Sequence, residues 1–419
     1  MSYKSPDSSA RHRKNRLVEN VLILQGGGSL GAFSCGIFKA LVKEEIKIDV
    51  VAGTSIGAIN AAIIAGSKSG HPETDLENFW LELAESSQEV IPDNYFFFYD
   101  WQNLKLESQK SSSASTNAAI FGVPKMFLPR WNPIYMFQDK DYFNPGNWTY
   151  YYDNKPLVNT LEKYIDYQRL TPEAVKSNTT SRTFAYNPRL IITSVDVLTA
   201  EPLVFDSLHI PIASKHLLAS SGYPNYGFSW TKIEEGVYGW DGSLLSNTPV
   251  REVISASSRN DKNLFIVENY SRKIDRLPSN MTEVLDRAKD IMFSDKTKHS
   301  IKMTKIMTRQ IRLIEQLYEY FEKSEENKTF HNKEAKYDSM NDFISNDEIE
   351  TIRKEYKNIV YNRGAEILSV TRILRNRIEN PNVSKNADFS VKMVKQLIAE
   401  GEQKALQSIK EFKTNNVCK

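Results

Sequence analysis

The sequence predicts an α/β fold in which helices cover both faces of a parallel sheet, followed by a charged α-helical region. Two apolar runs of strand length, 21–24 and 48–52, each lead through a glycine-containing turn into a segment with helical character. Two such strand–turn–helix units in close succession are typical of parallel sheets whose strands are buried on both faces. After about residue 281, apolar residues recur at helical spacing among many charged ones, which predicts amphipathic helices with solvated faces.

The composition excludes several classes of protein. The 419 residues include 54 basic and 52 acidic side chains, and this balance gives no strong field for nucleic acid. The two cysteines, Cys35 and Cys418, cannot build a disulfide framework or a cysteine-rich zinc site, and the six histidines lack ligand-like spacing. No apolar run approaches the ~20 residues of a membrane-spanning helix. We therefore expect a soluble intracellular enzyme without a cysteine-rich zinc site.

Composition also divides the chain into three parts. Residues 1–16 are polar and basic, without the apolar stretch of a secretory signal, which predicts a disordered tail and a cytoplasmic location. Residues 17–280 carry the α/β pattern and form the expected catalytic domain. An aromatic, proline-punctuated insertion interrupts it at about 91–152. Residues 281–419 form the charged α-helical C-terminal region.

The first candidate for chemistry is the G-x-S-x-G motif GTSIG at residues 53–57. Ser55 lies at the predicted junction of a buried strand and a helix, where a sharp turn can expose its Oγ as a nucleophile. Gly53 and Gly57 remove side chains that would crowd this turn. The alternative is that Ser55 only caps the following helix.

The glycine-rich turn that follows the first strand is the second candidate. It comprises Gly26, Gly27, Gly28, Ser29, Leu30 and Gly31. A dinucleotide site would need an acidic residue at the end of the second strand, but Asp49 stands at its start. The turn fits an oxyanion hole better, because unobstructed N–H groups would lie at the positive end of a helix. A tight structural turn is the other alternative.

A serine nucleophile also needs a base. His71, His209 and His216 are candidates, but none has a distinctive setting. Asp241 stands in a predicted turn before Gly242, and it could serve if a partly buried setting raised its pKa above the usual ~3.9. An Asp-Gly pair is also common in ordinary turns, so this pair alone leaves both interpretations open.

The three motifs together, in this order, resemble those of the patatin-like phospholipases, and the resemblance covers about Val21–Ile254. It implies a three-layer fold with a mostly parallel central sheet; the α-helical C-terminal extension is similar to that of bacterial and archaeal members. It also implies a Ser–Asp dyad with Ser55 as nucleophile and Asp241 as base, and no cofactor. The oxyanion hole would comprise Gly26, Gly27 and Gly28, with Ser29, Gly31, Gly53, Gly57 and Gly242 supporting the motifs. Two departures are Leu30, where many members carry Arg or Lys, and Ser243, which replaces Gly or Ala.

The function that the resemblance implies is a lipid acyl hydrolase that forms an acyl-enzyme. A soluble carboxylesterase or thioesterase would share the dyad, and a non-catalytic lipid-binding scaffold is a third class. The expected partner is a lipid or acyl-ester substrate. The insertion at 91–152 could form a lid, an acyl-binding wall or a satellite core.

A predicted helix at about 296–322 has two faces. Its apolar stripe comprises Met303, Met307, Ile311, Ile314, Tyr318 and Phe321. Its basic stripe comprises Lys298, Lys302, Lys305, Arg309 and Arg312. The apolar stripe could pack on the catalytic domain and leave the basic stripe solvated, or the basic stripe could hold the enzyme peripherally on anionic membrane.

Overall fold

The computed structural model describes most of the chain. The described ranges are 17–88, 115–180, 187–256, 260–294, 296–331, 346–363, 366–376 and 385–417. The expected disordered tail at 1–16 lies outside them, as does the insertion up to residue 114.

A central sheet organises the described part of the chain, and within that part it has eight strands. Its strands are β1 (Val18–Leu24), β2 (Val50–Thr54), β5 (Arg189–Asp196), β6 (Pro202–Asp206), β7 (Thr231–Glu234), β8 (Val237–Asp241), β9 (Asp261–Glu268) and β10 (Ile367–Leu374). The order is β10-β9-β1-β2-β5-β8-β7, with β6 also paired to β5. Neighbours from β10 to β5 run parallel, whereas β6, β7 and β8 pair antiparallel. A separate small sheet joins β3 (Leu128–Pro129) to β4 (Tyr152–Asp153).

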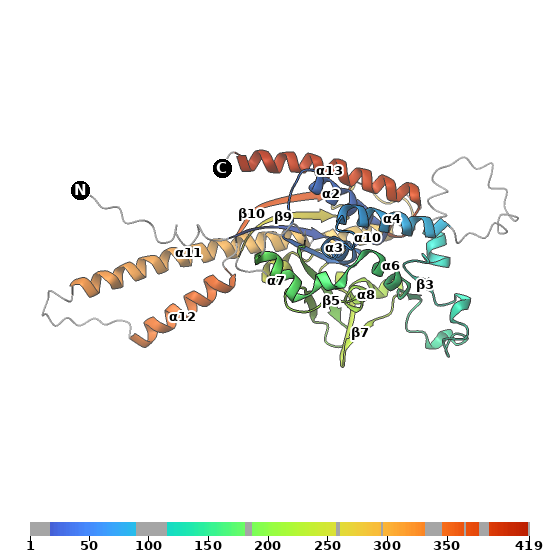
Figure 1. Ribbon diagram of the computed structural model, residues 1–419, viewed down its shortest axis with the longest axis horizontal. Helices are drawn as coiled ribbons and strands as arrows, with labels where there is room; N and C mark the ends of the chain where they lie inside the picture. Colours follow the sequence, from blue (N-terminus) through green and yellow to red (C-terminus); the bar gives the residue numbers. More distant parts are fainter. Residues whose placement is uncertain are drawn as a thin grey trace.

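Helices surround this sheet (Figure 1). The α-helices are α2 (Ala32–Lys43), α3 (Ile56–Ala65), α4 (Pro72–Gln88), α6 (Pro156–Tyr164), α7 (Pro172–Thr180), α8 (Ser214–Ser221), α9 (Val250–Ala256), α10 (Met281–Ser294), α11 (Lys296–His331), α12 (Asn346–Arg363) and α13 (Val391–Val417). The 3-10 helices are η1 (Gly28–Gly31), η4 (Pro133–Tyr135), η5 (Pro145–Asn147), η6 (Tyr167–Leu170), η7 (Pro224–Tyr226), η8 (Gly242–Leu244) and η9 (Lys385–Ala387). Among the described residues, no helix combines the length and hydropathy needed to cross a bilayer.

The core lies on both faces of the sheet because side chains alternate along each strand. Leu22 and Leu24 of β1 belong to a large cluster that includes residues of α2, α3, α4 and α13. Val21 and Ile23, pointing the other way, belong to a second cluster that includes Val253 of α9. The predicted three-layer arrangement, with a mostly parallel sheet between helices, is therefore confirmed.

The C-terminal region is mostly helical, as expected, but it also supplies a strand that the sequence analysis did not anticipate. β10 extends the sheet by pairing in parallel with β9. α13 lies along α2, and two glycines permit their close approach: a Cβ on Gly36 would lie 1.8 Å from the Ile398 oxygen, and one on Gly401 would lie 2.1 Å from the Phe33 oxygen. The C-terminal region thus shares the sheet and core of the preceding residues.

α11 and α12 are arranged differently, because they extend away from the sheet side by side (Figure 1). The rings of Tyr318 and Tyr356 stack between them at 3.6 Å. Along the predicted apolar stripe Ile311 is buried, but Met303 and Met307 are 43% and 40% exposed. The stripe therefore packs only in part.

Candidate active site

Ser55 stands in a sharp turn between β2 and α3. Its backbone has φ 59° and ψ −131°, a left-handed conformation that residues other than glycine rarely adopt. The turn is tight, because a Cβ on Gly57 would lie 2.2 Å from the Leu24 oxygen, and one on Gly53 would lie 2.2 Å from the Gly57 backbone. The Ser55 side chain makes no capping hydrogen bond to α3. The Ser55 hydroxyl is therefore not engaged by the N-terminus of α3.

The sheet register brings Asp241 beside Ser55. β5 lies between β2 and β8, with Thr54 paired to Thr193 and Asp241 paired to Ser194. Thr193 and Ser194 are consecutive in β5, so the last residues of β2 and β8 lie at the same level on its two sides. Ser55 and Asp241 line the same cavity, and the Ser55 hydroxyl lies close enough to the Asp241 carboxylate to stabilise its charged form.

Asp241 has the buried setting that a carboxylate base requires. It is 1% exposed, and burial raises its pKa to about 6 because a charged carboxylate is poorly solvated there. The Ser55 hydroxyl and the Ser243 N–H, which donates at 2.8 Å, stabilise the charged form and partly offset this effect. A carboxyl group with this pKa can take up and release a proton near neutral pH.

The glycine turn leaves β1 at the same edge of the sheet. The N–H of Gly26 donates to the Asn247 carbonyl at 3.3 Å, so it is already engaged. Gly27 and Gly28 line the cavity in front of Ser55, and their N–H groups have no acceptor among the described residues. The predicted oxyanion hole therefore stays a prediction, in a narrower form that rests on Gly27 and Gly28 rather than on Gly26.

The residues predicted to support the motifs lie near the glycine turn and Asp241. Gly31 precedes α2, and Gly242 begins η8 directly after Asp241. The Ser29 hydroxyl donates to the Lys385 carbonyl at 3.0 Å, so it faces the C-terminal region and not Ser55.

A cavity of about 270 Å³ opens beside Ser55 and Asp241. Its lining is mostly apolar, and the insertion contributes Met126, Phe127 and Tyr152 to it. Phe127 and Tyr152 meet edge to face at 5.4 Å, which ties this part of the insertion together. The described part of the insertion thus forms one wall of the cavity.

The histidine candidates lie elsewhere. His216 is buried, its Nδ1 accepts the Ala213 N–H at 3.0 Å, and burial lowers its pKa to about 4. His71 and His209 have mostly exposed side chains. None of the three lines the cavity. Across the described ranges, no group of three or more His, Cys, Asp or Glu side chains could hold a metal ion.

Sequence reasoning missed four residues that shape the site. The Ser220 hydroxyl accepts the Ser55 N–H at 3.0 Å and donates to the Thr193 carbonyl at 2.7 Å, which supports the turn. Asn247, Asn269 and Asn386 contact the glycine turn. Of these, Asn269 had a visible signal, because it directly follows a strand of the parallel sheet, as Ser55 does.

Comparison with known proteins relates this geometry to a family. Residues 22–254, more than half of the chain, match the profile of the patatin-like phospholipases. Short segments are similar to triacylglycerol lipase SDP1L of Arabidopsis thaliana (33% identity over 73 residues, 17% of this chain and 9% of that protein) and to lysophospholipase nte1 of Aspergillus terreus (50% over 44 residues, 10% and 3%). A third relative is patatin-like phospholipase domain-containing protein 7 of Mus musculus (35% over 72 residues, 17% and 5%). The matches thus span less than a tenth of the length of these relatives.

Two solved structures can be superposed on parts of the chain. VipD from Legionella pneumophila has a TM-score of 0.32 and 12% identity, covering 92% of this chain and 67% of that one. The ExoU–SpcU complex of Pseudomonas aeruginosa gives 0.29 and 15%, covering 69% and 52%.

Proposed function

The chain belongs to the patatin-like phospholipase family, and from that premise we propose that it is a lipid acyl hydrolase acting through a Ser55–Asp241 dyad. One observation carries the proposal: a serine in a strained strand–helix turn and a buried carboxylate with a raised pKa line the same apolar cavity. The family match and the names of the relatives support lipid ester hydrolysis as the reaction class.

In the proposed reaction, Ser55 Oγ attacks the carbonyl carbon of an ester while Asp241 accepts the hydroxyl proton. The N–H groups of Gly27 and Gly28 stabilise the oxyanion of the tetrahedral intermediate. Asp241 then protonates the leaving alcohol, and an acyl-enzyme remains. Water attacks this ester and gives its proton to Asp241, and the proton returns to Ser55 Oγ as the carboxylic acid leaves.

The cavity supports an acyl chain as the group that is bound. Met126, Phe127, Tyr152 and Phe293 offer apolar contacts next to the nucleophile, and such surface favours hydrocarbon over water. The insertion therefore serves as an acyl-binding wall in this proposal. Peripheral contact with anionic lipid through the exposed basic residues of α11 is a further part of the proposal.

A hydrolysis screen over phospholipids, acylglycerols, short esters and thioesters tests this function, with wild type compared with Ser55→Ala. Ser229→Ala is the matched control, because Ser229 lies outside the cavity lining. A fluorophosphonate adduct should map to Ser55 by peptide sequencing. Turnover of short esters or thioesters alone would replace the lipase with the esterase or thioesterase alternative. Absence of both turnover and adduct would leave the lipid-binding scaffold.

A further inference from the structure

Two asparagine side chains hold the carbonyl groups of the glycine turn. Asn269 Nδ2 donates to the Gly26 carbonyl at 3.1 Å and to the Gln25 carbonyl at 3.1 Å. Asn386 Nδ2 donates to the Gly27 carbonyl at 2.9 Å. Both asparagines are buried, and in each case the partner is a carbonyl oxygen, which can only accept. The amide nitrogens must therefore face the turn.

A held carbonyl also fixes the direction of the next N–H. The C=O of one residue and the N–H of the following residue share a planar trans peptide unit and point in opposite directions. Holding the Gly26 carbonyl therefore orients the Gly27 N–H, and holding the Gly27 carbonyl orients the Gly28 N–H. Gly27 and Gly28 both line the cavity, and their N–H groups have no acceptor in the part of the chain that the structure describes.

We infer that Asn269 and Asn386 are positioning residues that orient the two N–H donors of the oxyanion hole, an inference that rests on the proposed hydrolase function. Neither side chain needs to touch the substrate. Each acts through one peptide plane, so the C-terminal region takes part in catalysis through Asn386.

Asn269 is held by the strand before it and by its neighbours. It follows β9 directly, and its backbone N–H donates to Gln25 Oε1 at 2.6 Å. The Gln25 side chain in turn donates to the Thr248 hydroxyl at 2.9 Å and to the Phe293 carbonyl at 3.0 Å. The Gln25 amide is thus fixed at both ends, and it anchors the Asn269 backbone beside the glycine turn.

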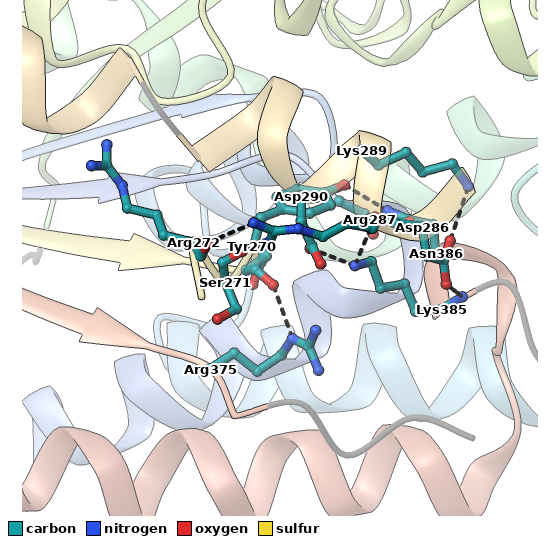
Figure 2. Close-up of polar contacts among 12 residues, drawn as sticks. Tyr270, Ser271, Arg272, Asp286, Arg287, Lys289, Asp290, Arg375, Lys385 and Asn386 are labelled. Atoms are coloured by element: carbon teal, nitrogen blue, oxygen red, sulfur yellow. Dashed lines mark hydrogen bonds and ion pairs between the residues drawn. The ribbon is translucent and has the colours of Figure 1, made fainter. Parts of the chain in front are cut away.

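Asn386 is held by buried charges next to it in the chain (Figure 2). Lys385 forms an ion pair with Asp290 of α10, and both side chains are 2% exposed. Its ammonium also lies 5.4 Å from the centre of the Tyr270 ring. Asn386 Nδ2 donates to the hydroxyl of this same tyrosine at 2.6 Å. Lys385 is therefore bound to α10, and Asn386 is bound to Tyr270, the residue that follows Asn269.

The turn and this segment are also in direct backbone contact. Gly28 has φ +58°, and a Cβ there would lie 2.4 Å from the Asn386 carbonyl oxygen. The glycine turn therefore rests against residue 386, so its conformation depends on that residue being in place.

The test is the ratio of hydrolysis rates for an ester and for the matching thionoester, measured for Asn386→Ala and Asn269→Ala in the full-length protein. Sulfur accepts hydrogen bonds poorly, so the oxygen-over-sulfur ratio reports how well the oxyanion donors are aimed. Loss of one such donor lowers kcat by about 10²–10³-fold. We expect each variant to lose about 10²-fold in kcat with little change in KM, and its ratio to fall toward one. Asn376→Ala, an exposed asparagine after β10, is the matched control.

The ratio does not depend on how much of a variant is folded, because both substrates are cleaved by the same active molecules. An unchanged ratio in both alanine variants, or undiminished kcat, would overturn the inference. Asn386→Asp keeps the size but turns an acceptor toward the Gly27 carbonyl, and it should lower the ratio as Asn386→Ala does. If wild type and Ser55→Ala hydrolyse both esters equally, the proposed function itself fails instead.

Discussion

Two regions of the molecule each bury a carboxylate, and they use it differently. Asp241 and Asp290 are both 1% exposed. Burial raises the pKa of Asp241 to about 6, and its polar neighbours, the Ser55 hydroxyl and the Ser243 N–H, are neutral. Asp290 faces the Lys385 ammonium. Burial beside neutral donors thus suits proton transfer, whereas burial beside a cation fastens two segments together.

The largest expected effect is a loss of activity on substitution of Asp241 without a loss of stability. Asp241→Asn should lower kcat/KM by about 10²–10⁴-fold, the usual contribution of a general base. The free energy of unfolding at pH 8 should not fall, because no buried cation loses its partner. Ester hydrolysis and urea unfolding measure the two quantities. His209→Ala should keep its activity, and a loss confined to that variant would assign the base to histidine.

Asp290→Asn should reverse this pattern. It removes the carboxylate charge from the buried Lys385 ammonium, and breaking a buried ion pair from one side costs about 3–5 kcal/mol of unfolding free energy. The matched control is Glu322→Gln, which breaks the exposed pair with Arg353 between α11 and α12 and should leave the urea midpoint nearly unchanged. Equal shifts in the two variants would refute the distinction between these sites.

The pH dependence sharpens the comparison further. Below pH about 6 Asp241 carries a proton and cannot accept another, so kcat/KM should fall about tenfold per pH unit. The folded pKa lies above the unfolded one, so wild type loses stability from this group as the pH rises from about 4 to about 6. The free energy of unfolding of Asp241→Asn minus that of wild type should therefore be more positive at pH 8 than at pH 4. An acid limb near pH 6 that persists in the residual activity of Asp241→Asn would belong to another group.

The smallest effect on the enzyme itself concerns charges that are not buried. Lys302, Lys305 and Arg309 of α11 are exposed, so changing all three to Gln should leave folding and soluble-ester hydrolysis intact. Sedimentation with anionic vesicles should fall and show less salt dependence, at about 1 kcal/mol per basic residue at most. If the triple variant sediments like wild type, these charges are only solvated.

The residues that could be predicted from the sequence are those that local patterns mark. Ser55 follows a buried strand within a glycine-flanked motif, and Asp241 precedes a glycine in a turn. The parallel sheet followed from apolar runs that alternate with helical segments. Such features are visible in the sequence because sharp turns and buried strands restrict which residues can occupy them.

The remaining features arise from contacts between distant parts of the chain. Asn386 and Gly27 are 359 residues apart, and no spacing rule connects them. β10 is an edge strand within a charged segment, so its pattern resembled that of its helical neighbours. The sequence could not show that the Gly26 N–H differs from those of Gly27 and Gly28. Its hydrogen bond to the Asn247 carbonyl depends on where the segment after Asp241 folds back.

The late position of Asn386 in the chain has a consequence for biosynthesis. A polypeptide emerging from the ribosome presents Ser55 and Asp241 well before residue 386 has been made. On the role inferred for Asn386, such a nascent chain has its nucleophile and base but lacks a fully oriented oxyanion hole. On this inference, docking of residues 385–387 would complete the oxyanion hole, and partly synthesised molecules would have low hydrolase activity.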